Sequence, residues 1–179
     1  MLLTNVNKYD RIKRKRKKKR MLYISNDRLE KVFKYNIKHG TIIIPNEVKV
    51  IGFRAFQFSQ DLKTIVIPKQ VEVVEVEAFK GCFHLTTVKF ETDDCKIGSG
   101  AFKSCKQLTN INLPRNMQYL PSRIFLECEN LKSIVIPENI REINLEEFEG
   151  CTKLNNIHFK DHIYTYTDLQ AYGRFLCKS

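Results

Sequence analysis

The sequence lacks any long hydrophobic stretch. None of its 179 residues belongs to an unbroken apolar run of about 18 to 20 residues, the length that a membrane-spanning helix needs. Met1, Leu2 and Leu3 are the only apolar run at the start, and no apolar segment of about 7 to 15 residues follows, as an export signal would require. We therefore expect an intracellular protein without a transmembrane segment.

Motifs that carry catalysis or cofactor binding are also missing. The seven glycines form no phosphate-binding loop, and neither a Gly-x-Ser-x-Gly elbow nor a Cys-x-x-Cys pair occurs. His158 and His162 are four apart, but they fall in a predicted strand and the turn after it rather than on a helix. Glu146, Glu147 and Glu149 are interpreted as a solvated face. We assign no catalytic residue, no cofactor and no metal ligand, and we expect no enzymatic activity.

Positive charge is concentrated at one end of the chain. Residues 1–40 hold 14 Lys and Arg against 3 Asp and Glu, and the remaining residues hold 17 of each. Most of the excess is an unbroken run of eight cations: Lys13, Arg14, Lys15, Arg16, Lys17, Lys18, Lys19 and Arg20. Adjacent like charges repel and bury nothing, so we expect residues 1–20 to be a disordered basic tail.

The basic run suits three kinds of partner: an importin-like receptor, nucleic-acid phosphate or an anionic membrane surface. It has no interleaved aromatic residues, so nucleic-acid binding would rest on charge alone and would weaken with added salt. A solvated tail without a partner is the alternative. As a targeting signal, the run predicts a nuclear location in a eukaryote or a eukaryotic virus, and a cytoplasmic one otherwise.

Residues 21–40 are expected to form an N-terminal cap. A short strand is predicted near residues 21–24, and residues 27–30 (Asp-Arg-Leu-Glu) resemble a helix capping box. Leu29, Val32, Phe33 and Ile37 would then share one face of an amphipathic helix that ends at Gly40.

From residue 41 the sequence repeats with a period of 23. Five units align without insertion, at 41–63, 64–86, 87–109, 110–132 and 133–155, and a degraded sixth unit or C-terminal cap occupies 156–179. We call the five units coils 1 to 5. Such a period is typical of a solenoid, in which each unit buries its apolar side against its neighbours.

Equivalent positions in the units share their chemistry. A Leu-x-x-Ile-x-Ile segment predicts a short strand, and in four units a proline closes it. Coil 3 has Glu91 in place of the proline and Asp94 at an apolar position, so we expect a local bulge that turns Cys95 inward. Two further columns are expected in the core, one of phenylalanine and one of cysteine: Phe56, Phe79, Phe102, Phe125 and Phe148, and Cys82, Cys105, Cys128 and Cys151. Without an export signal, we expect these cysteines to be reduced.

The repeated Ile-x-Ile-Pro-x-x-Val-x-x-Ile-x-x-x-Ala-Phe-x-x-Cys-x-x-Leu pattern, over residues 41 to about 160, resembles the BspA-like (Treponema-type) leucine-rich repeat family. The resemblance implies a leucine-rich-repeat solenoid, an α/β-repeat superhelix of short parallel strands with one helical or 3-10 turn per coil. It also implies a non-catalytic role in contacts with other macromolecules. Many members are surface or secreted adhesins.

Two hypotheses on function follow. In the first, the protein is a scaffold that binds another protein through the outward side of the strands. A variable column there is the predicted binding face: Ile43, Val66, Lys89, Asn112, Val135 and His158. In the second, the basic run binds and the solenoid only carries it. A surface adhesin is a third alternative.

Overall fold

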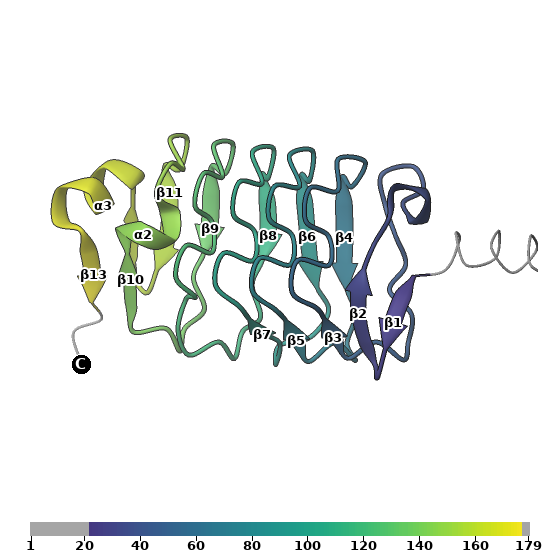
Figure 1. Cartoon of the computed structure of the whole chain (residues 1–179). Coiled ribbons are helices and arrows are strands. Elements are labelled where there is room, and N and C mark those ends of the chain that lie inside the picture. The colour runs from purple at the N-terminus through teal and green to yellow at the C-terminus, as the bar shows by residue number, and fades with distance from the viewer. Residues whose placement is uncertain (1–21, 177–179) are drawn as a thin grey trace, which may run out of the picture.

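Each repeat forms one coil of a solenoid in the computed structural model, which describes residues 22–176 (Figure 1). The predicted strand segments form a first sheet along one side of the stack: β4 (Thr64–Ile67), β6 (Thr87–Phe90), β8 (Asn110–Asn112), β9 (Ser133–Val135) and β11 (Asn156–Phe159). Their side chains alternate between core and solvent, as the period of two in a strand requires. Except between β8 and β9, neighbouring strands pair in parallel with residues one repeat apart, such as Thr64 with Thr87. The predicted solenoid of short parallel strands is confirmed.

A second parallel sheet lies on the other side of the coils. It contains β3 (Val50–Ile51), β5 (Val73–Val74) and β7 (Lys96–Ile97), which pair in register one repeat apart. In coil 5 the equivalent strand is β10 (Glu142–Asn144). These strands lie at the end of the Val-x-x-Ile part of the repeat pattern, as at Ile51, where no strand was predicted.

The corner that follows the second sheet is a series of hydrogen-bonded turns in coils 1 to 4. In coil 1 the N–H of Ala55 donates to the carbonyl of Gly52, and that of Gln57 donates to Arg54. Bonds between residues three apart are those of a 3-10 turn. Arg54 and Phe58 have positive φ, however, so the turns do not join into a continuous 3-10 helix. Only coil 5 has a helix here, α2 (Leu145–Phe148).

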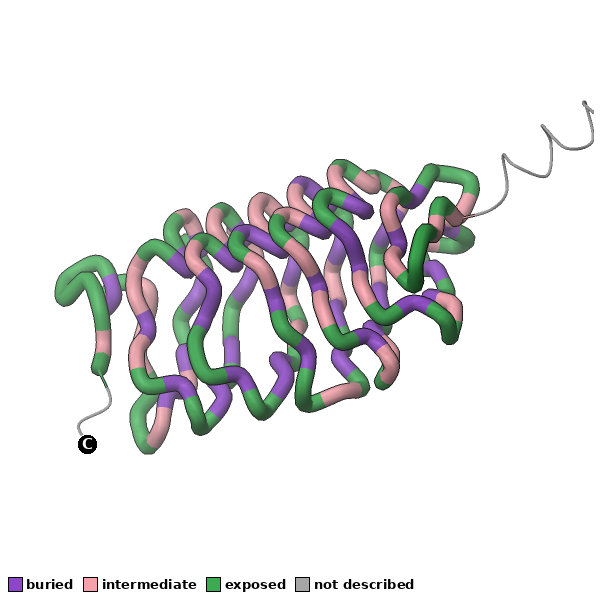
Figure 2. Tube along the Cα trace, turned by 60° about the horizontal axis from the view of Figure 1, so that its bottom comes forward, coloured by how far each residue is buried: buried purple, intermediate pink, exposed green. Residues whose placement is uncertain are grey.

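The core is a set of side-chain columns that run along the solenoid axis, so buried stretches recur at equivalent places in successive coils (Figure 2). The five phenylalanine rings are fully buried and stacked, with centroids 4.6, 5.4, 6.1 and 5.7 Å apart from one end to the other. The four cysteines of the column are buried and free. Each thiol donates a hydrogen bond to a phenylalanine carbonyl of the preceding coil, as from Cys105 to Phe79 over 3.2 Å.

In coil 3 Cys95 points inward, as predicted. Cys95 is buried and Asp94 is exposed. The Asp94 carboxylate accepts a hydrogen bond of 2.6 Å from the side-chain amide of Asn116 in the next coil. The local shift therefore puts a small thiol into the core and leaves the charge in solvent, where its solvation is kept.

The helix expected between residues 27 and 40 does not form. Instead, β1 (Tyr23–Ser25) and β2 (Arg28–Lys31) make an antiparallel hairpin, followed by the 3-10 turn η1 (Lys34–Asn36). The loop residues Asn26 and Asp27 both have positive φ, at 49° and 57°, as a two-residue type I′ turn requires. β2 then pairs in parallel with β3, so the hairpin covers the end of the second sheet.

The C-terminal end is covered by two antiparallel strands. β12 (His162–Tyr164) pairs with β11, and β13 (Arg174–Leu176) pairs with β10. Between them lies α3 (Tyr166–Tyr172), whose N-cap Thr165 exchanges hydrogen bonds with Asp168. The last repeat strand of each sheet, β11 or β10, is therefore covered by an antiparallel strand.

One acidic side chain differs from its expected place. Glu147 was expected on a solvated face with Glu146 and Glu149, but it is only 3% exposed. Its carboxylate accepts hydrogen bonds from the backbone and side-chain N–H groups of Asn144, and so caps the start of α2. Burial raises the pKa of Glu147 against the lowering effect of these bonds.

The first sheet is interrupted between coils 4 and 5, and the second sheet has no strand in coil 4. β8 and β9 lie next to each other but do not pair, and β7 has no partner strand in coil 4. In the second sheet, Pro121 breaks the bonding between coils 3 and 4. It occupies the position of Gly52, Glu75 and Gly98, whose N–H groups each donate to the coil before, and proline has no N–H to donate. The corner turns still join coils 4 and 5. The Phe125 N–H, for example, donates to the Glu147 carbonyl over 2.9 Å.

Candidate functional site

The predicted binding residues lie in one row on the solvent side of the first sheet. Strand pairing places Val66, Lys89 and Asn112 side by side in coils 2 to 4. Val135 and His158 are likewise neighbours on β9 and β11. Ile43 is the equivalent residue of coil 1, where the extended segment 41–44 is not paired with β4. The structure therefore brings all six residues to one surface, which we call the strand face.

The two ends of the row are apolar and exposed. Ile43 is 86% exposed and Val135 is 68% exposed, whereas Val66 is 36% exposed. β12 adds a seventh member that the repeat pattern could not contain, because Ile163 pairs across from His158 and is 61% exposed. To predict Ile163 from the sequence, the turn between β11 and β12 would have had to be recognised. Lys160, at φ 54°, is the only residue of that turn with positive φ, and a lysine does not indicate such a turn.

The middle of the row is polar, and one of its members already has a structural role. The Asn112 amide donates to the Phe90 carbonyl over 3.0 Å and accepts from the Phe90 N–H over 3.1 Å. It thus replaces the last rung of the ladder between β6 and β8. Lys89 is exposed beside it. The strand face therefore offers one cation between two apolar ends.

A small-residue column runs parallel to this row. Thr64 and Thr87 are half-buried, and Asn110 and Ser133 are exposed. In the loops that precede the strands, Thr86 and Thr109 each donate a side-chain hydrogen bond to the carbonyl one repeat earlier, over 3.0 and 3.1 Å. These bonds help to hold successive coils in register beside the binding row.

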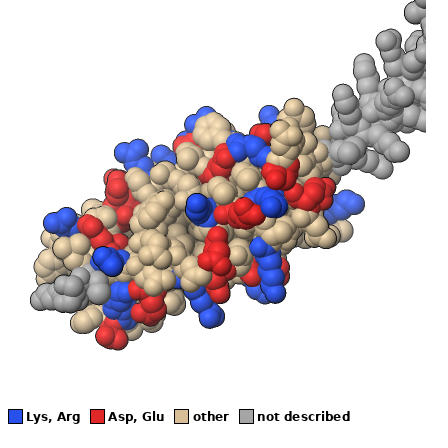
Figure 3. Space-filling model, turned by 90° about the horizontal axis from the view of Figure 1, so that it is seen from below, with Lys and Arg blue, Asp and Glu red and all other residues tan. Residues whose placement is uncertain are grey.

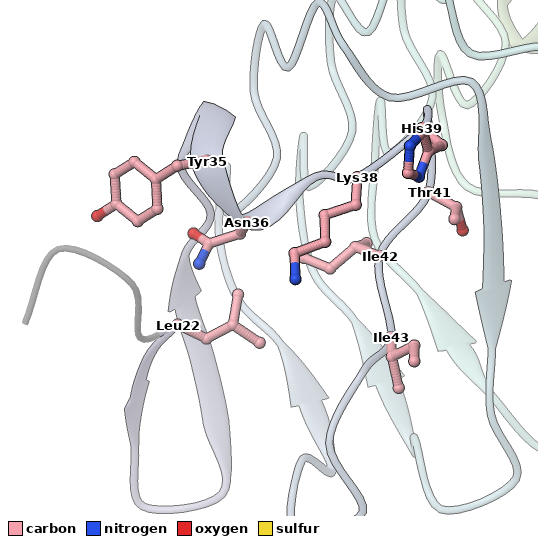
Figure 4. A pocket seen from close by; sticks show the side chains of 8 residues that line it. All are labelled: Leu22, Tyr35, Asn36, Lys38, His39, Thr41, Ile42 and Ile43. Carbon is pink, nitrogen blue, oxygen red and sulfur yellow. The ribbon is translucent and has the colours of Figure 1, made fainter. Parts of the chain in front are cut away.

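A hollow adjoins the N-terminal end of the strand face. It is a groove of about 800 Å³. Figure 4 shows the side chains of the cap and of coil 1 around it, with the Lys38 ammonium pointing between them. The groove is lined by Leu22, Tyr35, Asn36, Lys38, His39, Thr41, Ile42 and Ile43.

The side of the second sheet carries charges of both signs. Figure 3 shows basic and acidic side chains intermixed over this face, without a large area of one sign. Several form ion pairs between neighbouring coils, such as Lys49 with Glu72 over 3.2 Å. Residues 22–176 hold 20 Lys and Arg against 19 Asp and Glu, so this part of the chain has almost no net charge with which to attract a polyanion.

The predicted basic run at residues 13–20 lies outside the residues that the structure describes. Within residues 22–176, no group of three or more His, Cys, Asp or Glu side chains is placed to hold a metal ion. In the same range, no helix has the length and apolar character to cross a bilayer.

Stacked coils of 23 residues, with parallel strands on one side and a phenylalanine column inside, define a leucine-rich-repeat solenoid. A family model described as the BspA-type leucine-rich repeat region matches residues 29–155 and 119–172, with six copies. The chain belongs to this family, as the resemblance of its repeats implied.

Two solved structures are similar to this chain. One is a leucine-rich cell surface protein from Faecalibacterium prausnitzii, 27% identical with a TM-score of 0.68 over 75% of this chain and 35% of that one. The other is the leucine-rich repeat protein of T. pallidum, 26% identical with a TM-score of 0.61 over 66% of this chain and 57% of that one. This chain therefore spans about a third to just over half of their lengths. No curated protein matches it.

Proposed function

We propose that the protein is a non-catalytic scaffold that binds another protein through its strand face. The observation that carries the proposal is the row from Ile43 to Ile163, which exposes apolar side chains along one side of the solenoid. Exposing branched apolar residues to water is unfavourable, and burial of each by a partner contributes up to about 1.5 to 3 kcal/mol. Backbone that is already held in paired strands also loses little conformational entropy on binding.

The sequence of the row supports a specific partner rather than a general apolar surface. The two apolar ends are separated by Lys89, so a complementary partner would carry a carboxylate between two apolar contacts. A charge in such a position discriminates between partners more than it adds affinity. The neighbouring column of small residues would allow the partner to approach the sheet closely.

A triple substitution tests the strand face. Lys89→Glu, Val135→Asp and Ile163→Asp reverse or add charge at exposed positions that hold no other part of the fold together. We expect these changes to abolish capture of the partners that the wild-type chain retains, and the far-ultraviolet circular dichroism to stay the same.

The matched control carries Val76→Asp and Tyr119→Asp, which change two exposed apolar residues away from the first sheet. We expect the control to capture the same partners as wild type. Loss of the same partners by the control, or their retention by the triple variant, would show that the strand face is not the binding surface.

A second candidate, exposure of this scaffold on a cell surface, is favoured by one comparison. The Faecalibacterium protein is named as a cell surface protein. Antibody labelling of intact and of permeabilised cells distinguishes this location from the nuclear or cytoplasmic one that the basic run predicts. Comparing the full chain with a variant that lacks residues 13–20 shows whether the run directs the location.

A further inference from the structure

Among the described residues, no strand covers the first sheet at its N-terminal end. At the C-terminal end, β12 pairs with β11 of the first sheet and β13 pairs with β10 of the second sheet. At the N-terminal end, the β1–β2 hairpin covers the second sheet, because β2 pairs with β3. At this end of the first sheet, among the described residues, the backbone of Ile42, Ile43 and Ile44 makes no backbone hydrogen bond.

The groove also lies at this end. Leu22 and Tyr35 form its outer wall and Ile42 and Ile43 its inner wall (Figure 4). An extended segment with unpaired N–H and C=O groups is a template for strand addition. A groove with apolar side chains on two sides would then receive one side chain of the added strand.

A segment of this chain has the sequence of such a strand. Residues 3–7 read Leu-Thr-Asn-Val-Asn, and residues 108–112, which lead into and form β8, read Leu-Thr-Asn-Ile-Asn. Four of the five positions are identical, and the fifth exchanges valine for isoleucine. By the alternation of β8, Val6 would point inward, and Asn5 and Asn7 would point to solvent.

We propose that residues 3–7 pair in parallel with the extended segment 41–44, at the N-terminal end of the first sheet. In the register of the other coils, Val6 lies beside Ile42 and its side chain enters the groove against Leu22. Asn7 lies beside Ile43 and continues the row of the strand face by one position. The basic run is then part of the connection between this strand and the β1–β2 hairpin.

The connection is long enough for this topology. Parallel neighbours require a crossover of about a dozen residues or more, and 14 residues separate Asn7 from Leu22. These can span up to about 50 Å when extended. Leu22 itself lines the groove, so the chain needs to reach only from one wall of the groove to the other.

Hydrogen exchange at one amide reports on the added strand. The N–H groups of Thr64 and Thr87 donate to the coil before them. Thr41 is the equivalent residue of coil 1, and the N–H of Ile43, two residues later along the strand, would point in the same direction, toward the added strand. We expect the Ile43 amide to be protected in the full chain. Leu3→Asp with Val6→Asp should reduce its protection by about tenfold or more, because an inward charge expels the strand.

The control places the same two charges on the outward side of the segment. Asn5→Asp with Asn7→Asp should leave the Ile43 amide as protected as in wild type. If the Ile43 amide exchanges at the rate of an open amide in the wild-type chain, or if both double variants behave alike, the proposal is wrong.

A cross-link tests the register and the identity of the added strand. With Cys177 replaced by serine, Asn7→Cys and Ile43→Cys should form an intramolecular disulfide, because neighbouring strands lie about 4.8 Å apart. Asn5→Cys with Ile43→Cys is the antiparallel alternative and should not. A disulfide formed between two chains, with protection of Ile43 that depends on protein concentration, would assign the edge to a second copy and overturn the proposal.

Discussion

At the scale of the residue, a single thiol in each coil links it to the coil before. Cys82, Cys105, Cys128 and Cys151 each donate to a phenylalanine carbonyl over 3.1 to 3.2 Å. Their burial raises every pKa, for Cys82 and Cys151 to about 12. The column therefore keeps its thiols protonated as hydrogen-bond donors, and they are poor nucleophiles in the folded protein.

Thiol labelling tests this column. At pH 8 a shift of the pKa from 9.0 to about 12 lowers the thiolate fraction about a thousandfold. We expect Cys82, Cys105, Cys128 and Cys151 to remain unlabelled by iodoacetamide in the native protein and to react together on unfolding. Mass spectrometry of the peptides resolves each site.

Ser59 occupies the equivalent position in coil 1 and is half-buried, which provides the control. A Ser59→Cys variant should be labelled in the native state. Equal native rates at this new thiol and at Cys82 would show that the column is open to solvent.

At the scale of the element, the repeat columns could be predicted because each coil confirms the assignment of the others. One phenylalanine alone does not show whether its position is buried. Five phenylalanines at the same position of the repeat indicate that this position lies in the core. The same reasoning places the binding row on the strand face, because strand alternation fixes which side faces solvent.

The caps could not be predicted in this way, because each occurs only once. Leu29 and Val32 are spaced as on one face of a helix. They are also both buried when β2 forms a strand and pairs with β3. The deciding signal was Asn26 and Asp27, two residues that tolerate positive φ and suit a hairpin turn. Ile163 was missed for the same reason, since it enters the strand face through a hairpin at the end of the repeats.

The interruption between coils 4 and 5 is a second feature that the average repeat conceals. β8 and β9 do not pair, coil 4 has no strand in the second sheet, and the Asn112 amide at the end of β8 bonds back to Phe90 of β6. The two coils are thus held by their corner turns and core columns. We expect this junction to open more readily than any other in the stack.

Hydrogen exchange should locate the junction. Ser133 and Val135 would donate to β8 in an unbroken ladder, but neither N–H has a backbone acceptor there. Their amides should exchange faster than those of Asn156 and His158, the equivalent residues one coil later. Asn156 donates to the Lys132 carbonyl over 3.2 Å. Equal protection at the two pairs of positions would mean that the ladder is continuous in solution.

At the scale of the whole molecule, an ion pair ties the N-terminal cap to the stack. The Arg28 guanidinium on β2 reaches across coil 1 and forms a two-pronged contact with the Glu75 carboxylate of coil 2. Gly52 makes this crossing possible, because an added Cβ would lie 2.8 Å from the Leu29 carbonyl oxygen and 3.1 Å from Arg28 Nε. A cap fixed to two coils covers the core better than one fixed to its neighbour alone.

This ion pair gives stability a dependence on pH. The hydrogen bond from Arg28 lowers the pKa of Glu75 below its ordinary value of 4.5. The folded state therefore binds the proton less readily than the unfolded state. The contribution of the pair is fully present above pH 4.5 and is lost as the pH falls through the folded pKa. Both side chains are less than a third exposed, so we expect a contribution of about 1 kcal/mol at pH 7.

Urea unfolding of Glu75→Gln measures this contribution. At pH 7 the variant should lose about 1 kcal/mol of unfolding free energy, and the difference from wild type should shrink as the pH falls below 4.5. Glu72→Gln is the matched control, because Glu72 lies in the same coil and pairs with Lys49 in solvent, where the two side chains are 65% and 54% exposed. A pair that is open to water contributes little, so the control should unfold like wild type at every pH. Equal effects of the two substitutions, or a Glu75→Gln effect that persists in acid, would show that the cap is held by the hairpin pairing and not by this ion pair.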